Sequence, residues 1–108
     1  MKIERYGIYL AELNPTRGAE IGKTRPLLVI SDDDMNAALQ TIVVCPLTTS
    51  IHPGWRSRIQ FISAGKRAEI AVDQIRTISK DRLLKKIDEV KPFKAKELRL
   101  LITEMYGE

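Results

Sequence analysis

The apolar residues of this 108-residue chain come in short runs that are separated by polar stretches rich in Gly and Pro. Short β-branched or alternating runs between turn-forming residues are typical of strands rather than of long helices. We therefore expect strands at residues 6–13, 26–30, 41–46, 58–62, 69–78 and 86–90. Within 69–78, simple alternation places Gln74 and Arg76 on one face and Asp73 on the other, unless a bulge changes the register.

Two segments are typical of helices. Ser31 and the aspartates after it should open a short helix that runs to about residue 38, because such side chains accept hydrogen bonds from free first-turn amides. The segment 93–106 is the clearer helix, since its apolar residues recur at the spacing of one helical face: Leu98, Leu101, Ile102 and Met105. Gly107 stands at a position typical of a C-capping glycine.

These elements predict a mostly β protein with added helices (α+β). The expected fold is a small antiparallel barrel packed by a C-terminal helix. The length fits a single domain over residues 1–108.

Composition narrows the class of protein further. Lys and Arg number 18 against 14 Asp and Glu, a net charge of +4 that suits a polyanion partner or an ordinary soluble surface equally well. Cys45 is the only cysteine and His52 the only histidine, so a disulfide framework is excluded and a structural zinc site is not expected. The sequence has no apolar run of about 20 residues for a membrane span and no apolar signal stretch near Met1. We expect a soluble cytoplasmic protein.

Two apparent motifs have simpler explanations. Residues 18–24 resemble a phosphate-binding P-loop, but three residues separate the two glycines where that motif has four. The segment also leads into Arg25 and Pro26 and then a strand, whereas a P-loop leads into a helix. The consecutive aspartates 32–34 are better explained by helix capping than by Mg²⁺ binding, because neighbouring helical side chains diverge.

Arg25 is the candidate functional residue that stands out most. Pro26 favours an extended backbone at Arg25, so the guanidinium should project from the start of a strand, beside the polar loop 14–24. There it could bind a phosphate in bidentate fashion, or it could be a surface arginine with a carboxylate partner. The residues alone favour neither interpretation.

Three further features are open to two interpretations. The hydroxyls of Thr48, Thr49 and Ser50 could donate to a phosphate or simply form a loop. Trp55, which Arg56 and Arg58 follow closely, could stack on an RNA base or anchor its loop. Because His52 is the only histidine, catalysis by a pair of histidines from one chain is excluded. His52 could still act alone as a general acid or base, although a solvated loop histidine is the favoured interpretation.

Taken in order, these segments resemble the MazF/PemK (Kid) family of toxin endoribonucleases from type II toxin–antitoxin systems. The resemblance covers about residues 6–83, and its motifs are Gly7-Ile8-Tyr9, Leu13-Asn14-Pro15, Gly18-Ala19-Glu20, Gly22 to Pro26, Leu28-Val29-Ile30, Val43 to Thr49 and Asp73 to Ile78.

The resemblance implies an SH3-like (CcdB/PemK-type) barrel that acts as a homodimer. It also implies an mRNA interferase, which cleaves single-stranded RNA at short motifs without metal or other cofactor and so inhibits translation. The products would be 2′,3′-cyclic phosphate and 5′-hydroxyl ends. Messenger RNA is the expected substrate, with rRNA and tRNA as further candidates. A cognate antitoxin of the MazE type would neutralise the protein. The protein would bind operator DNA only as part of the complex with this antitoxin, and no membrane partner is expected.

The family's catalytic arginine and threonine fall on Arg25 and Thr48. Two carboxylates, Glu20 and Asp73, are candidates for catalysis or RNA contact. The expected RNA-binding residues are Lys23, Thr49, Ser50, Trp55, Arg56, Gln74 and Arg76, and no residue is assigned to a metal. Some relatives have a histidine where this chain has Ala19 and an arginine where it has Ala71, so their acid–base assignment does not transfer whole.

The chemistry of RNA agrees with this assignment. Because the ribose 2′-hydroxyl is the nucleophile, the enzyme needs only to move protons and stabilise charge on the phosphate, which Arg25 and Thr48 could do. Two alternatives remain: a gyrase-binding toxin of the CcdB type, which shares the barrel, and a non-catalytic RNA-binding or autoregulatory barrel.

Overall fold

The computed structural model describes residues 1–13 and 24–107. Its elements, in chain order, are β1 (Gly7–Glu12), β2 (Thr24–Val29), α1 (Asp33–Ala38), β3 (Thr41–Thr48), β4 (Arg58–Ser63), β5 (Lys66–Ala71), the 3₁₀ turn η1 (Val72–Gln74), β6 (Arg76–Ser79), the 3₁₀ turn η2 (Lys80–Arg82), β7 (Leu83–Glu89) and α2 (Pro92–Tyr106).

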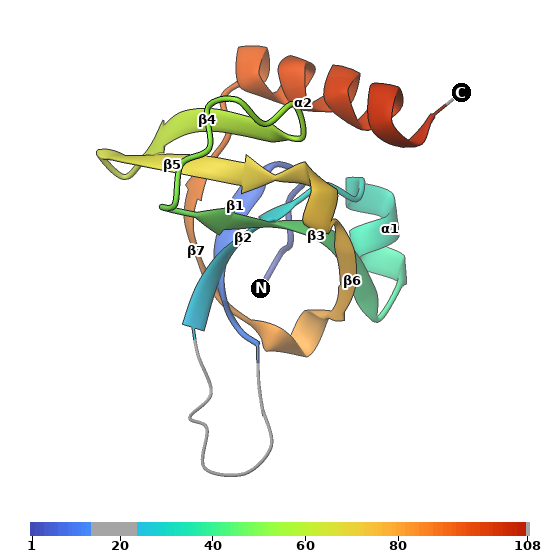
Figure 1. Cartoon of the computed structure of the whole chain (residues 1–108). Helices are drawn as coiled ribbons and strands as arrows, with labels where there is room; N and C mark the ends of the chain where they lie inside the picture. Colours follow the sequence, from blue (N-terminus) through green and yellow to red (C-terminus); the bar gives the residue numbers. More distant parts are fainter. Residues whose placement is uncertain (14–23, 108) are drawn as a thin grey trace, which may run out of the picture.

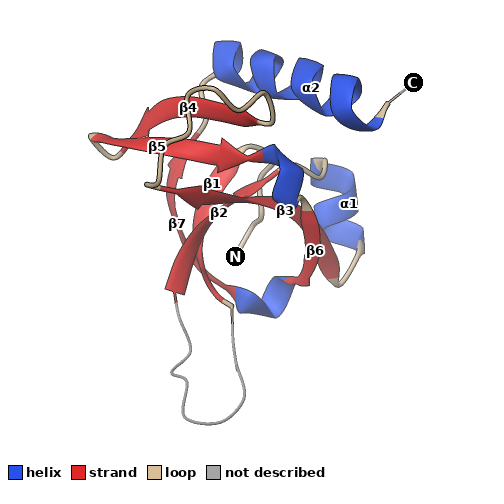
Figure 2. Cartoon of the chain, in the orientation of Figure 1, coloured by secondary structure: helices blue, strands red, loops and turns tan. Residues whose placement is uncertain are grey.

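The strands of the described residues form one curled antiparallel sheet, and α2 lies alongside β4 (Figures 1 and 2). The strand order is β4-β5-β3-β2-β1-β7, and β6 pairs with β3. Strand β3 is central: it pairs with β2 through Val44–Pro46, with β6 through its first half and with β5 through its last two residues. The predicted mostly β fold with a C-terminal helix is therefore confirmed.

The sheet is buried on both faces, which explains the continuous apolar runs in the sequence. In β2 and β3, Leu28 and Cys45 belong to one apolar cluster, whereas Leu27 and Val44 belong to another. The first cluster includes buried residues of α2, and the second lies on the opposite face of the strands. Because adjacent residues of a strand point to opposite faces, both must be apolar where both faces are covered.

Helix α2 packs on the sheet through the predicted apolar stripe. Leu98 is fully buried in the first cluster, and Leu101, Ile102 and Met105 are partly buried against it. Gly107 ends the helix, but with extended backbone (φ −86°) rather than a left-handed one. Glycine suits this position because a Cβ would lie 2.7 Å from the carbonyl oxygen of Thr103.

Helix α1 begins as the sequence predicts. Asp32 is its N-cap, and the carboxylate Oδ1 accepts a hydrogen bond from the backbone N–H of Met35 at 2.8 Å. This contact supports the capping interpretation of the aspartate run.

The predicted single strand over residues 69–78 is wrong. Strand β5 ends at Ala71, residues 72–74 form η1, and β6 begins at Arg76. Ile70 lies opposite Leu47 and Arg76 lies opposite Val44, so the seven residues 70–76 run along only four residues, 44–47, of β3. The turn η1 accommodates the three extra residues, and the expected alternation of Asp73 against Gln74 and Arg76 does not hold.

No helix in the described ranges is both long and apolar enough to cross a membrane.

Candidate active site

A pocket of about 670 Å³ opens where the start of β2, the end of β3 and the turn η1 meet. Five residues expected in the functional site line it together: Arg25, Thr48, Thr49, Gln74 and Arg76. The structure thus gathers residues as far apart in the chain as Arg25 and Arg76. Glu20 and Lys23, two further expected site residues, lie outside the described residues.

Four cations of this pocket have no carboxylate partner in the described part of the chain: Arg25, Lys66, Arg67 and Arg76. No Asp or Glu is among the described residues that line it. Unpaired cations around a concave surface attract an anionic ligand, and arginine in particular matches the geometry of a phosphate. The pocket is therefore suited to a phosphate group.

Arg25 lies on β2 opposite Ala11 of β1, and its side chain is exposed. The extended backbone that Pro26 predicts is confirmed. Since Arg25 forms no ion pair with a described residue, its guanidinium is available to a ligand at the mouth of the pocket.

Thr48 is the last residue of β3 and is partly buried. Its Oγ1 accepts a hydrogen bond from the backbone N–H of Ser50 at 3.0 Å. Because the hydroxyl accepts this bond, its own hydrogen remains available to donate to a ligand oxygen. Ser50 itself is exposed and does not line the pocket.

A buried carboxylate, Glu69, lies directly across the ladder from Thr48. Its side chain is fully buried and accepts hydrogen bonds from the backbone N–H of His52 at 2.6 Å, from Gln60 Nε2 at 2.7 Å and from Arg58 Nη1 at 2.7 Å. Burial alone would raise the pKa of Glu69, but the hydrogen bonds from His52, Gln60 and Arg58 lower it to about 2. Glu69 is therefore ionised at neutral pH.

Arg58 joins Glu69 to Asp73. The Nε of Arg58 donates to Oδ1 of Asp73 at 2.7 Å, and the Arg58 side chain is only 5% exposed. The hydrogen bond from Arg58 lowers the pKa of Asp73. Asp73 is thus held by Arg58 and is not among the residues that line the pocket.

His52 is a partly exposed loop histidine, as the sequence favours, but neighbouring side chains hold its ring in place. Its Nδ1 lies 3.1 Å from Oε2 of Glu69, and its ring stacks on Trp55 with centroids 3.9 Å apart. The guanidinium of Arg58 lies 4.6 Å from the centroid of the Trp55 ring. His52 lines the pocket, whereas Trp55, which is half exposed, does not.

Arg56 has a different environment from its neighbours. It forms an ion pair with Glu104 of α2 and does not line the pocket. Arg56 therefore lies outside the cluster that surrounds Thr48.

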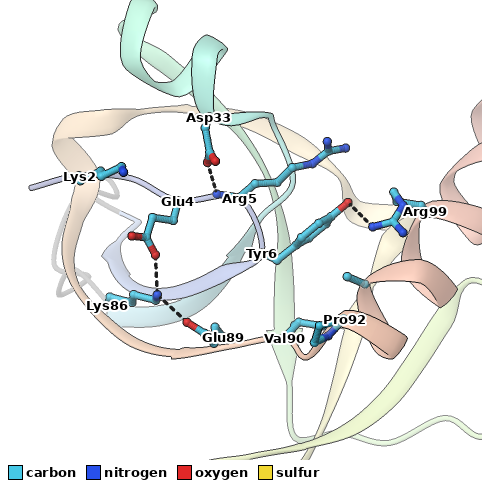
Figure 3. Close-up of a pocket in the computed structure, with 11 residues that line it drawn as sticks. Lys2, Glu4, Arg5, Tyr6, Asp33, Lys86, Glu89, Val90, Pro92 and Arg99 are labelled. Atoms are coloured by element: carbon cyan, nitrogen blue, oxygen red, sulfur yellow. Dashed lines mark hydrogen bonds and ion pairs between the residues drawn. The ribbon is translucent and has the colours of Figure 1, made fainter.

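A second pocket, of about 440 Å³, lies near the N-terminus and α2 (Figure 3). Unlike the pocket at Arg25, it is lined by carboxylates, namely Glu4, Asp33 and Glu89, and its Lys86 contacts both Glu4 and Glu89 at 2.8 Å. This pocket offers an anion fewer available cations than the pocket at Arg25.

The side chains that could bind a metal ion do not cluster in the described part of the chain. Within the ranges that the structure describes, no three His, Cys, Asp or Glu side chains gather closely enough to hold a metal ion.

A curled antiparallel sheet with a cationic pocket at the end of its central strand defines a small β protein with a pocket suited to an anionic ligand. Over residues 4–106 the chain matches the family described as the PemK-like, MazF-like toxin of type II toxin–antitoxin systems. The chain belongs to this family.

Individual relatives agree with the family match. The chain is 32% identical over 110 residues to "Endoribonuclease MazF" of Staphylococcus saprophyticus, a match that covers 97% of this chain and 92% of the relative. Its fold is similar to a solved MazE–MazF structure from Deinococcus radiodurans, with a TM-score of 0.85, 21% identity and coverage of 99% and 97%. It is also similar to a mycobacterial endoribonuclease solved with its cognate antitoxin, with a TM-score of 0.77, 20% identity and coverage of 98% and 94%.

Proposed function

We propose that this protein is a toxin endoribonuclease that cleaves single-stranded RNA at short motifs without a metal ion. The observation that carries the proposal is the pocket that brings Arg25 of β2 and Thr48 of β3 together among unpaired cations. Membership of the PemK/MazF family and the activity named for its curated relative support the same conclusion.

In this mechanism, the ribose 2′-hydroxyl attacks the adjacent phosphorus and the bond to the 5′-oxygen breaks. Arg25 stabilises the charge that develops on the non-bridging oxygens, and Thr48 donates a hydrogen bond to one of them. The products are a 2′,3′-cyclic phosphate and a 5′-hydroxyl. Because a guanidinium keeps its protons in proteins, Arg25 is a better charge stabiliser than a proton donor.

RNA contacts extend beyond the reacting phosphate. Gln74, Arg76 and Thr49 line the same pocket and would bind neighbouring nucleotides, with Ser50 and Lys23 as further contacts. Trp55 and Arg56 lie outside the pocket and would contact RNA only where the strand leaves it. Asp73, which is bound to Arg58, would act by holding Arg58 in position rather than by accepting a proton.

The partners follow from the same proposal. We infer a cytoplasmic homodimer that inhibits translation by cleaving mRNA and is neutralised by a MazE-type antitoxin. Solved relatives include a MazE–MazF assembly. An acidic antitoxin segment would match the cations of the pocket.

The test is cleavage of a long, structure-poor RNA in excess EDTA, with the product ends mapped. Arg25→Ala and Thr48→Ala should each lower the cleavage rate by at least about 100-fold, the usual effect of losing a group that stabilises transition-state charge. Arg25→Lys and Thr48→Ser are the matched controls, because they retain the charge and the hydroxyl, respectively. Wild-type rates in both alanine variants would refute the site assignment. Intact RNA with the folded wild-type protein would refute the nuclease proposal and direct attention to gyrase or to RNA binding alone.

A further inference from the structure

We propose that His52 is the general base of the cleavage reaction: Glu69 holds the ring through Nδ1, and Nε2 accepts the proton of the attacking 2′-hydroxyl. The inference rests on the proposed endoribonuclease function and deepens it, because Arg25 and Thr48 leave the proton acceptor unassigned.

Glu69 fixes both the main chain and the ring of His52. Its Oε1 accepts the His52 backbone N–H at 2.6 Å, and its Oε2 lies 3.1 Å from Nδ1. The stack on Trp55, with an interplanar angle of 17°, restrains the plane of the imidazole. A loop residue with three such contacts is preorganised in the way that a catalytic base requires.

The ionised state of Glu69 determines which ring nitrogen carries hydrogen. An ionised carboxylate can only accept hydrogen bonds, so Nδ1 must be the donor in this contact. In the neutral imidazole the lone pair is then on Nε2. His52 lines the same pocket as Arg25 and Thr48 and its side chain is 32% exposed, so the ring is open to a ligand in that pocket.

The charged groups around His52 come from two strands. Glu69 of β5 contacts the ring directly, and Arg58 of β4 donates to the same Oε2 and contacts Asp73 on its other side. Arg58, Glu69 and Asp73 together carry one net negative charge on one side of the ring. On the other side, the pocket that His52 lines also holds four cations, Arg25, Lys66, Arg67 and Arg76.

Asp73 is a weaker candidate for the same role. Its hydrogen bond from Arg58 lowers its pKa, and the residue does not line the pocket. A carboxylate that is already paired with a guanidinium is a poor proton acceptor.

The 2′-hydroxyl proton moves to Nε2 of His52 as the bond between O2′ and phosphorus forms and the bond between phosphorus and O5′ breaks. The departing O5′ takes a proton from a water molecule. The hydroxide that remains takes the proton from His52 and restores the neutral ring.

The experiment measures cleavage rates of labelled, structure-poor RNA between pH 5 and pH 9, at saturating protein and in EDTA. For the wild type we expect a rate that rises with pH, because a general base accepts a proton only in its unprotonated form. Because His52 is the only histidine, NMR of its ring reports its midpoint directly, and the two midpoints should agree.

His52→Phe retains a flat ring against Trp55 but lacks the nitrogens. We expect it to cleave at least about 100-fold more slowly, to lose the rising limb and to bind RNA within about threefold of the wild type. For His52→Gly, added imidazole should restore part of the rate, whereas Arg25→Ala should not respond to imidazole. Thermal unfolding of each variant checks that the fold is intact.

The outcomes separate this inference from the proposed function. If wild type cleaves RNA and His52→Phe keeps both the rate and the rising limb, His52 is not the base and the nuclease proposal stands. If His52→Phe only weakens RNA binding and cleaves normally at saturation, His52 is a binding residue and the inference is also overturned. A wild-type protein that cleaves nothing overturns both.

Discussion

The buried carboxylate Glu69 makes a quantitative prediction about acid stability. Its pKa is about 2 in the folded protein against an ordinary value of 4.5. Each pKa unit corresponds to about 1.4 kcal/mol, so the ionised side chain contributes roughly 3 kcal/mol to the free energy of unfolding at pH 7. Because the pKa is lowered by folding, this contribution is present above about pH 5 and is lost as the pH falls towards 2. At pH 3, about 2 kcal/mol of it should be gone.

Glu69→Gln removes this contribution at a nearly constant side-chain volume. We expect the variant to be less stable than the wild type by about 3 kcal/mol at pH 7, in line with the cost of breaking a buried ion pair. The difference should shrink to about 1 kcal/mol at pH 3. The assay is urea unfolding followed by far-UV circular dichroism at pH 7, 5, 4 and 3. The other carboxylates with lowered pKa values, such as Asp88, remain in both proteins, so the difference isolates Glu69.

Glu104→Gln is the matched control, because Glu104 is an exposed carboxylate paired with Arg56. Exposed ion pairs contribute little, so this variant should differ from the wild type by less than about 1 kcal/mol at every pH. A stability difference for Glu69→Gln that stays constant from pH 7 to pH 3 would refute the reasoning, since it would mean that the charge of Glu69 is not what stabilises the fold.

Two further predictions concern the core. Leu98→Ala should destabilise the protein by about 2–5 kcal/mol and lower the melting temperature by at least about 8 °C, because Leu98 is fully buried on the face of α2 that packs on the sheet. Leu100→Ala, on the exposed side of the same helix, should change stability by less than about 0.5 kcal/mol. Equal losses in both variants would contradict the packing described. Burial raises the pKa of the Cys45 thiol to about 12, so little reactive thiolate should form in the folded protein at pH 8. Iodoacetamide at pH 8, followed by mass spectrometry, should therefore modify the folded protein at least about 100-fold more slowly than the urea-unfolded chain. Comparable rates would show that the thiol is accessible.

Most of the secondary structure could be predicted from the sequence, because local patterns decide it. The apolar stripe of α2 and the aspartate cap of α1 are set by side chains within a few residues of one another. Arg25 and Thr48 could be proposed as site residues because they stand in recognisable motifs. The break at Val72 could not be predicted, since it depends on how β5 and β6 share β3 as a partner.

The network around Glu69 was missed for a different reason. An acidic residue in an alternating strand is normally expected on the solvent face, and the sequence around Glu69 offers no signal to the contrary. Its partners Arg58 and His52 lie 11 and 17 positions away. Only the pairing of β4 with β5 and the return of the β3–β4 loop bring them together.

The sequence alone determines most of the elements and the apolar faces, because these depend on periodicity and capping. It also supplies Arg25 and Thr48 as candidate site residues through the family resemblance. The tertiary structure decides which of these side chains share a pocket and which are paired. Arg25 and Arg58 each lie near the start of a strand, β2 and β4 respectively. Arg25 is available to a ligand at the mouth of the pocket, whereas Arg58 is buried between Glu69 and Asp73. The cost of burying a charge explains the difference, because a guanidinium can be buried only where the fold supplies carboxylates that form ion pairs with it.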